Sequence, residues 1–574
     1  MLSTLPPNAP HLVATEWSKQ LVVNGKPFLM LAGELQNSSL TSAEYMDTVW
    51  QKMVDTNVNT LLGCVTWEMI EPVEGEFHFD VLDSIILGAR KYSMHLVLLW
   101  FGSFKNGIST YTPGWVKTNP KRFPRAKLRK AGGILTTGDV ISIFHPEGVK
   151  ADARAFGRLM EHLKEFDEKH STVLMVQVEN ETGILGDSRD ASEGANKVFG
   201  SHVPSDLVAF LRKDWDSLHP DLKANLIHFQ TQTLASGSNT PVLGGTWETI
   251  FGKGPHTDEL FMAYHYAKYL NTVAAAGKAV YPIPHYTNVW MNYVAEDADN
   301  DFPIVAGGGG LPGDYPSGGA VSNVLDVWHE FAPNLDFIAP DVYLNDYGKT
   351  CAKYRHRNQP LFIPEQRRDD YGVRRIWVAY GSYAALGTSP FGIDTLEPDT
   401  NPFRRHYGLL KSVSAIVLEA QRHPDSSVGF FFDEIAADGS DSSKPIVRQW
   451  GGYEITIERC FVFGKPGTGA GMVIHKGNGV FLLIGWGFHV RARALSPTAT
   501  FTGFLRFEEK AVQDEATGAL KTLRVLNGDE TRSGIFAMMP NEDPDYGGFP
   551  ICVTIPARTM IAELEVYHLD ESDD

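Results

Sequence analysis

Short apolar segments rich in β-branched residues recur along the first two thirds of the chain, with polar and amphipathic stretches between them. This alternation is typical of a parallel sheet whose strands are buried on both faces and connected by helices. Eight segments are predicted to be strands, namely residues 28–32, 58–62, 95–100, 173–178, 279–284, 336–340, 360–364 and 386–391. Eight such strands predict an α/β fold of the (β/α)₈ TIM barrel type.

The connecting segments show helical periodicity. Residues 79–92 place Val81, Leu82, Ile85, Ile86 and Ala89 on one face at three- and four-residue spacing, and residues 151–169 and 402–422 have similar patterns. A doubly wound open sheet is the competing fold. It is disfavoured because no glycine-rich phosphate-binding fingerprint stands where a first strand would turn into a helix.

Three long excursions interrupt the alternation of strands and helices. Residues 105–145 follow the third predicted strand, residues 182–275 the fourth and residues 286–325 the fifth. All three leave from the carboxyl ends of strands, which is the face where barrel enzymes carry their binding loops. We therefore expect these excursions to form the walls of a pocket.

The pattern changes near residue 429. A polar stretch at residues 438–444 is followed by short alternating segments separated by Gly, Asn and Pro, which predicts an all-β sandwich. Its expected strands are residues 453–457, 472–475, 480–484, 501–506, 552–555 and 562–567. We thus predict a barrel over residues 1–428 and a β-sandwich domain over residues 429–574, which either binds carbohydrate or, as we favour, packs on the barrel.

The net charge narrows the class of partner. There are 51 Lys and Arg against 69 Asp and Glu, a net charge of −18, without any basic block. Nucleic acid and anionic membrane surfaces are therefore excluded as expected partners. An uncharged polar ligand such as a carbohydrate fits better, and an aromatic content of 11% suits flat sugar faces. Association into a homo-oligomer is left open.

The N-terminal residues and the cysteines indicate a cytoplasmic location. The first residues lack a charged and then apolar signal-peptide pattern, and no run of about 18 apolar residues predicts a membrane-spanning helix. Cys64, Cys351, Cys460 and Cys552 are far apart and form no Cys-x-x-Cys pair. They are expected to be buried thiols rather than zinc ligands or disulfide partners.

Two carboxyl groups stand at the ends of predicted strands. The fourth strand runs into Glu179, Asn180 and Glu181, and the seventh ends at Glu365. Side chains alternate along a strand, so Glu179 and Glu181 should share a face unless the strand end kinks. Strands four and seven face each other across a barrel. Two carboxyl groups about 5–5.5 Å apart are the equipment for hydrolysing a glycosidic bond with retention of configuration.

These residues resemble the pattern of the clan of retaining (β/α)₈ glycosidases, Asn-Glu after strand four and Glu after strand seven. Residues 65–80 look like the Trp…Glu-Pro…Gly-x-Phe-x-Phe segment of family 35 and family 42 β-galactosidases. Residues 178–183, Val-Glu-Asn-Glu-Thr-Gly, resemble the Val-Glu-Asn-Glu-Tyr-Gly motif of family 35, which we judge the closer match. The resemblance covers residues 15–420.

The resemblance implies roles for four residues. Glu181 would be the general acid/base and Glu365 the nucleophile. Asn180 would donate a hydrogen bond to the sugar 2-hydroxyl, and Tyr343 would donate one to the nucleophile. Burial and the nearby charge of Glu365 would keep Glu181 protonated at the start of the reaction.

The chain departs from family 35 at two sugar-binding segments. Residues 99–107 replace Gly-Pro-Tyr-Ile-Cys-Ala-Glu, and residues 33–38 replace a Ser-Gly-x-x-His-Tyr type run. Galactose, glucose or another β-linked hexose is therefore a candidate for the sugar. Further candidate contacts lie at or just past the strand ends, either in the sugar site or as loop and core residues. They are Glu34, Asn37, Trp67, Lys105, Trp100 and Trp290.

The predicted function is that of a retaining, β-galactosidase-like exo-β-glycosidase that removes a terminal hexose by double displacement. The alternatives are transglycosylation or hydrolysis of another β-glycoside such as a β-glucoside, and a non-catalytic sugar-binding protein on a decayed barrel. The presence of both carboxylates beside Asn180 and Pro364 counts against decay. No His-Glu-x-x-His zinc signature is present, and we expect neither a metal nor a cofactor.

Overall fold

A computed structural model describes residues 8–231, 244–293, 309–460, 466–541 and 554–571. Its N-terminal part is an eight-stranded parallel sheet with the order β11-β10-β9-β6-β5-β4-β13-β12. A parallel bridge between Val342 and Gln366 joins the two ends of this order and closes the barrel. The strands are β4 (Met30–Glu34), β5 (Thr60–Thr66), β6 (His95–Phe101), β9 (Val173–Val178), β10 (His285–Trp290), β11 (Phe337–Asp341), β12 (Ile363–Gln366) and β13 (Gly387–Pro390). The predicted (β/α)₈ barrel is confirmed.

The fifth strand was predicted in the wrong place. Residues 279–284 form the end of helix α12 (Pro255–Val280) and the turn after it, and β10 begins at His285. The segment is apolar enough to resemble a strand, but Pro282 and Pro284 have no N–H to donate to a central ladder. The true strand carries His285, Thr287 and Asn288, and polar residues of this kind did not mark it as a core strand.

Helices cover the outside of the barrel. The predicted helices are confirmed as α4 (Asp80–Lys91) and α6 (Pro146–Asp167), and residues 402–422 form two helices, α17 (Phe403–Ser412) and α18 (Ser414–Ala420). Helix α4 buries Leu82, Ile85, Ile86 and Ala89, as its spacing predicts, whereas Val81 is exposed. The other barrel helices are α1 (Ala43–Asp47), α2 (Trp50–Asp55), α3 (Trp67–Ile70), α14 (Leu325–Phe331), α15 (Tyr347–Lys353) and α16 (Asp370–Ser382). No described helix is both long and apolar enough to cross a membrane.

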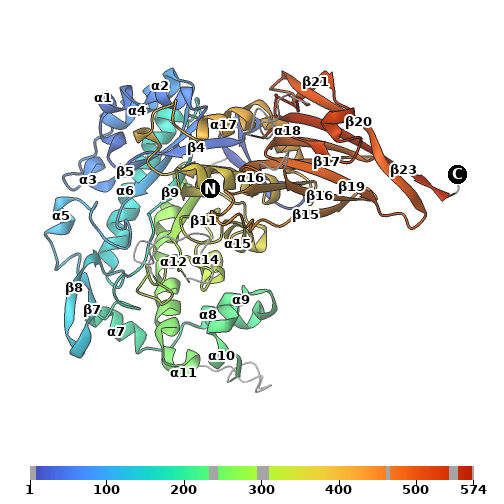
Figure 1. Ribbon diagram of the computed structural model, residues 1–574. Helices are drawn as coiled ribbons and strands as arrows, with labels where there is room; N and C mark the ends of the chain where they lie inside the picture. Colours follow the sequence, from blue (N-terminus) through green and yellow to red (C-terminus); the bar gives the residue numbers. More distant parts are fainter. Residues whose placement is uncertain (1–7, 232–243, 294–308, 461–465, 542–553, 572–574) are drawn as a thin grey trace.

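The long excursions form structure of their own, most of it below the barrel in Figure 1. The first contains α5 (Gly114–Lys117) and a hairpin of β7 (Arg125–Arg129) and β8 (Leu135–Ile141). The second contains α7 (Glu193–Phe199), α8 (Ser205–Lys213), α9 (Pro220–Asn225), α10 (Ile227–Phe229), α11 (Trp247–Phe251) and α12. A small sheet of β1 (His11–Ala14), β2 (Lys19–Val23) and β3 (Lys26–Pro27) precedes the barrel.

The C-terminal part consists of two antiparallel sheets, at the right in Figure 1. One has the order β14 (Ser427–Phe432), β17 (Gly469–Gly477), β18 (Val480–Trp486), β23 (Ile561–Asp570), β20 (Ala499–Asp514), β21 (Ala519–Val525). The other has the order β15 (Ile446–Trp450), β16 (Tyr453–Arg459), β19 (Phe488–Ala494), β22 (Ala537–Met538). Both sheets contribute buried residues to one hydrophobic cluster, so the predicted sandwich is confirmed. Of the strand expected at residues 552–555, the first two residues lie outside the described residues, and residues 554 and 555 are not part of a strand.

The sandwich packs directly on the barrel. Helix α16 contacts β14 and β17, and a T-shaped ring contact joins Trp377 of α16 to Trp486 of β18. Met472, Ile484 and Trp486 of the sandwich are buried in the same hydrophobic cluster as the barrel helices. The apolar contact between the two parts is therefore continuous.

Candidate active site

A cavity of about 520 Å³ opens at the carboxyl ends of the barrel strands. Its described lining residues are Gln36, Asn37, Lys105, Asn106, Glu181, Trp290, Met291, Asp341, Tyr343, Leu344, Asn345, Glu365, Arg367 and Phe391. Of the three long excursions, residues 105–145 contribute Lys105 and Asn106 to this lining and residues 286–325 contribute Trp290 and Met291, whereas no described residue of 182–275 lines the cavity. The pocket is thus built mainly by the strand ends themselves.

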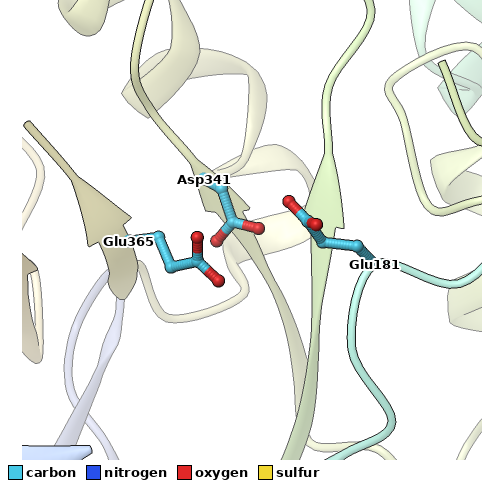
Figure 2. A group of neighbouring side chains, drawn as sticks. All are labelled: Glu181, Asp341 and Glu365. Atoms are coloured by element: carbon cyan, nitrogen blue, oxygen red, sulfur yellow. The ribbon is translucent and has the colours of Figure 1, made fainter. Parts of the chain in front are cut away.

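Three carboxyl groups meet in this pocket. Glu181 follows β9, Asp341 ends β11 and Glu365 lies on β12. Figure 2 shows that the three side chains point toward one another, and one oxygen of each lies within 4.8 Å of the others. All three residues are buried, with exposed fractions of 7%, 4% and 6%. The two carboxyl groups expected to face each other, those of Glu181 and Glu365, do so.

The backbone after β9 is kinked. Glu179 and Glu181 have φ angles of 60° and 44°, in the left-handed region that non-glycine residues rarely adopt. The two side chains consequently have different environments. Glu179 accepts hydrogen bonds from the backbone N–H groups of Ser103 at 3.1 Å and Phe104 at 2.7 Å. Glu179 therefore holds the loop after β6, while Glu181 faces the pocket.

Glu365 is surrounded by hydrogen-bond donors. The Tyr343 hydroxyl donates to Oε2 at 2.9 Å, and the side-chain amides of Asn180 and Asn288 donate to Oε1 at 3.4 Å and 3.3 Å. An ionised carboxylate accepts hydrogen bonds and donates none, so these three partners suit an anionic Glu365. The same partners fix the direction in which its oxygens point.

Glu181 has the opposite electrostatic environment. Burial, together with the negative charge of Glu365, raises the pKa of Glu181 to about 7, although the Lys105 ammonium and a hydrogen bond with Asp341 act in the other direction. Burial and the charges of Glu365, Glu181 and Glu34 also raise the pKa of Asp341 well above its ordinary value. Glu181 therefore keeps its proton to a higher pH than an ordinary glutamate side chain does.

Lys105 and Glu34 add a buried cation and a fourth buried acid. Lys105 is 7% exposed, and its ammonium lies 4.9 Å from the centre of the Phe101 ring. Burial would lower its pKa, but the charges of Glu365, Glu181 and Glu34 outweigh this effect and raise it. Glu34 is completely buried, and neither of its carboxyl oxygens has a hydrogen-bond partner in the described structure. Burial, followed by the charge of Glu365, raises the pKa of Glu34 well above its ordinary value.

The structure does not place Trp67 and Trp100 in the pocket, which corrects their expected role as sugar contacts. Trp67 is buried, and its indole N–H donates to Glu71 Oε2 at 2.8 Å. Trp100 is buried against α6, where its indole N–H donates to Asp152 Oδ1 at 2.9 Å. Its neighbour Leu99 belongs to the cluster inside the barrel, so strand alternation turns Trp100 outward to the helices.

The other expected site residues come together. Asn37, Lys105, Trp290 and Tyr343 line the cavity, and Asn180 and Glu34 lie buried beside it, close enough to interact with Glu365. These positions are compatible with sugar binding, which remains a prediction for each of them.

Two central residues were missed by sequence reasoning. Asp341 ends the sixth strand, the same kind of position that drew attention to Glu181 and Glu365, and it precedes Tyr343 by two residues. Asn288 lies on β10 and was overlooked because the fifth strand was misplaced. Its amide donates to Asp341 Oδ2 at 2.8 Å, and its Oδ1 accepts the backbone N–H of Glu181 at 2.9 Å.

The three carboxyl groups are the one cluster in the described residues with three acidic, His or Cys ligand atoms close enough to hold a metal ion. The Lys105 ammonium already places a positive charge near two of these groups, Glu181 and Glu365. The arrangement is therefore understood as a set of acids around a buried cation, and we assign no metal to it.

Comparison with protein families shows a relationship over the first part of the barrel. Residues 39–219 match the family model Glyco_hydro_42, described as beta-galactosidase. The segment contains Lys105, Asn180 and Glu181. The expectation that family 35 is the closer family is not supported, since the matching family of glycoside hydrolases is family 42. Residues 403–538 match a domain of unknown function, DUF5597, which begins at α17 and extends into the sandwich.

Solved structures with a similar chain course include two β-galactosidases. That of Bacillus circulans sp. alkalophilus is 15% identical, with 68% of this chain and 57% of that chain covered and a TM-score of 0.43. That of Rahnella sp. R3 is 15% identical, with 68% and 56% covered and a TM-score of 0.41. The catalytic domain of a β-amylase from Paenibacillus polymyxa is 12% identical, with 66% and 97% covered and a TM-score of 0.45. The chain thus spans little more than half of either β-galactosidase. No curated protein matches its sequence.

Proposed function

We propose that this protein is a retaining exo-β-glycosidase, related to the β-galactosidases, that releases a terminal β-linked hexose. The observation that carries the proposal is the pair of facing carboxyl groups, Glu181 and Glu365, at the mouth of the barrel with opposite surroundings. Glu365 receives three hydrogen bonds, whereas burial and a neighbouring negative charge keep a proton on Glu181. A nucleophile and a general acid require this difference.

The reaction would proceed in two displacements. Glu365 attacks the anomeric carbon as Glu181 transfers its proton to the departing glycosidic oxygen, and a glycosyl ester forms on Glu365. Glu181, now ionised, then takes a proton from the incoming water, whose oxygen displaces Glu365 from the sugar. Two inversions give overall retention. An alcohol of a second sugar in place of water would give transglycosylation by the same steps.

The charges of the pocket support a neutral sugar as substrate. Lys105 already faces Glu34, Glu181 and Glu365, so a uronic acid would add another negative charge to an acid-rich site. The Lys105 ammonium can donate to a sugar hydroxyl, and the buried oxygens of Glu34, which lack partners in the described structure, can accept from one. We propose that these residues and Asn37 bind sugar hydroxyls and that Trp290 stacks on a sugar face.

The family match favours galactose as the first sugar to test, because the matching model is described as beta-galactosidase and covers Glu181. Glu34 and Lys105 lie in the two segments whose sequences depart from the sugar-binding segments of family 35. The sugar specificity is therefore open, and β-glucosides and β-fucosides belong in the same panel of substrates. A β-glucuronide serves as the charged comparator.

The test is turnover of nitrophenyl and disaccharide β-glycosides, with the first-formed anomer followed by NMR. Glu365→Gln should abolish turnover of every substrate. Glu181→Gln should lose on the order of 10²–10⁴-fold on disaccharides and less on nitrophenyl glycosides, whose leaving group needs little protonation. Glu165→Gln, which removes an exposed carboxyl group on α6, is the matched control and should be as active as the parent.

Two results would contradict the proposal. Release of the inverted anomer would exclude Glu365 as a nucleophile. Binding of sugars by a folded protein that turns over none of the panel, with or without a sugar acceptor, would favour a non-catalytic sugar-binding protein.

A further inference from the structure

Asp341 is a third pocket carboxyl group that the two-carboxylate reaction does not use. It is the last residue of β11 and is 4% exposed. Its Oδ2 accepts the Asn288 amide at 2.8 Å, while its Oδ1 is buried and receives no hydrogen bond from a nitrogen or hydroxyl of the described residues. In Figure 2 its carboxyl group faces that of Glu181. What lies across from Asp341 is thus another acid.

Two facing carboxyl groups without a donor between them are stable when one of them carries a proton. If both are ionised, two negative charges oppose each other in a buried site. If one is protonated, its O–H donates to the other, and the contact becomes a charge-assisted hydrogen bond. Asn288 limits the rearrangement of the pair, because it donates to Asp341 Oδ2 and accepts the backbone N–H of Glu181.

The other charged groups around Glu181 and Asp341 do not neutralise the pair if both members are ionised. Glu34, Glu181 and Glu365 face Asp341, and the hydroxyl groups of Tyr286, Tyr343 and Tyr354 are the other titratable neighbours. Lys105 faces Glu34, Glu181 and Glu365. Arg367, the second cation that lines the cavity, is paired with Asp369. Four ionised acids around one buried ammonium would leave an excess of negative charge.

We propose that Glu181 and Asp341 hold one proton between them, and that Asp341 is a positioning residue that keeps this proton available to Glu181. The kinetic part of this inference rests on the proposed glycosidase function, whereas the shared proton does not. The hydrogen bond between the two groups lowers the pKa of Glu181 and raises that of Asp341, so it favours the state in which Asp341 holds the proton and Glu181 is ionised. The last proton of the pair is nevertheless lost at a higher pH than that of a single carboxyl group in the same place, because the second ionisation creates two adjacent negative charges.

The charge balance of the reaction fits the pair. Before the first step, Glu365 carries one negative charge and the pair carries one. As the glycosidic bond breaks, the proton moves from the pair to the leaving oxygen, and the lone pair of Glu365 forms the new bond to the anomeric carbon. Glu365 becomes a neutral ester while the pair gains a charge, so the total is unchanged. The proton that water gives to Glu181 in the second step restores the starting state.

The kinetic test is the pH dependence of kcat/KM in Asp341→Asn. The new amide can still accept from Asn288, so the fold should be retained, but it cannot share an acidic proton with Glu181. We expect the alkaline limb, where the general acid loses its proton, to move to lower pH by about one unit. Asp346→Asn is the matched control, because it removes a carboxyl group from the loop that follows β11 and an Asn oxygen can still cap α15.

An unchanged limb in Asp341→Asn would overturn the proposal even if activity falls, because a purely structural role lowers the rate at every pH. The same conclusion would follow if Asp346→Asn moved the limb equally. Neither result would question the glycosidase itself, which is tested by Glu181→Gln and Glu365→Gln.

Infrared titration of the carboxylic acid C=O band tests the shared proton without turnover. Differences between the parent and each variant isolate the pair from Glu34 and Glu179, whose pKa values are also raised by burial. We expect Glu181→Gln and Asp341→Asn each to lower the pH at which the remaining member ionises. A band lost in one variant and unaltered in the other would assign the proton to a single residue and overturn sharing.

Discussion

At the scale of single residues, the site combines catalytic potential with a cost in stability. Burial and the charge of Glu365 raise the pKa of Glu181 to about 7, above its ordinary value near 4.5. The unfolded chain therefore releases the Glu181 proton at lower pH than the folded protein does. The stabilising contribution of the protonated group is complete below about pH 4.5 and is lost as the pH rises through about 7.

Glu181→Gln should reduce this dependence, because the amide does not ionise and no longer raises the pKa of Asp341. At pH 5 the variant and the parent should differ little, and at pH 8 the variant should be more stable by about 3 kcal/mol. Thermal unfolding followed by circular dichroism at both pH values, with Glu165→Gln as the control, measures the change. A Tm difference that is equal at pH 5 and pH 8 would show that the pKa of Glu181 is not raised in the folded state.

Residue identity at strand ends was sufficient to find Glu181 and Glu365, because an acid after an apolar strand is conspicuous in a sequence. Asp341 has the same signal at the end of β11, but a reaction that requires two carboxyl groups gives no reason to expect a third. The left-handed backbone of Glu181 could not be predicted. It depends on contacts from distant segments, such as the hydrogen bond between its N–H and Asn288.

At the scale of elements, seven of the eight strands were predicted close to their observed positions, because parallel barrel strands are continuous apolar runs. The fifth strand was predicted in the wrong place because the prediction relied on continuous apolar runs. The apolar end of α12 resembles a strand more closely than β10 does, since β10 carries several polar residues, among them Asn288 of the site. Strand alternation also decides whether a Trp on a strand faces the pocket or the surrounding helices. The direction of Trp100 and Trp290 therefore depends on the exact register of their strands, which the sequence pattern does not define.

Variants of Trp290 and Trp67 should distinguish a Trp that lines the cavity from a Trp that is buried in the core. Trp290→Ala removes a residue that lines the cavity and should raise KM about tenfold with little loss of stability. Trp67→Phe removes the donor to buried Glu71 and should lower the free energy of unfolding by about 1–3 kcal/mol without altering KM. Steady-state kinetics and thermal unfolding of both variants give the comparison. A raised KM in Trp67→Phe would restore Trp67 to the sugar site.

At the scale of the whole molecule, the barrel and the sandwich share one buried interface. The division at residues 428/429, which remains a prediction, falls within β14, where the strand contacts α16 of the barrel. The family match to residues 403–538 also crosses this division. Sequence patterns identified both parts, because each has its own periodicity. They could not show the interface, which depends on a close approach of two backbone segments.

Gly429 on β14 lies close to the backbone of α16. A Cβ atom there would overlap the carbonyl oxygen of Trp377, and the backbone of α16 cannot yield without moving the helix. Gly429→Ala should therefore destabilise the protein by about 3 kcal/mol and lower the Tm of a single calorimetric transition, since the barrel helices and the sandwich share one hydrophobic cluster. Gly467→Ala is the matched control, because nothing lies within 4 Å of the added atom. Two separate transitions in the parent would mean that the barrel and the sandwich unfold independently. A Gly429→Ala variant as stable as Gly467→Ala would mean that the contact between β14 and α16 contributes little to stability.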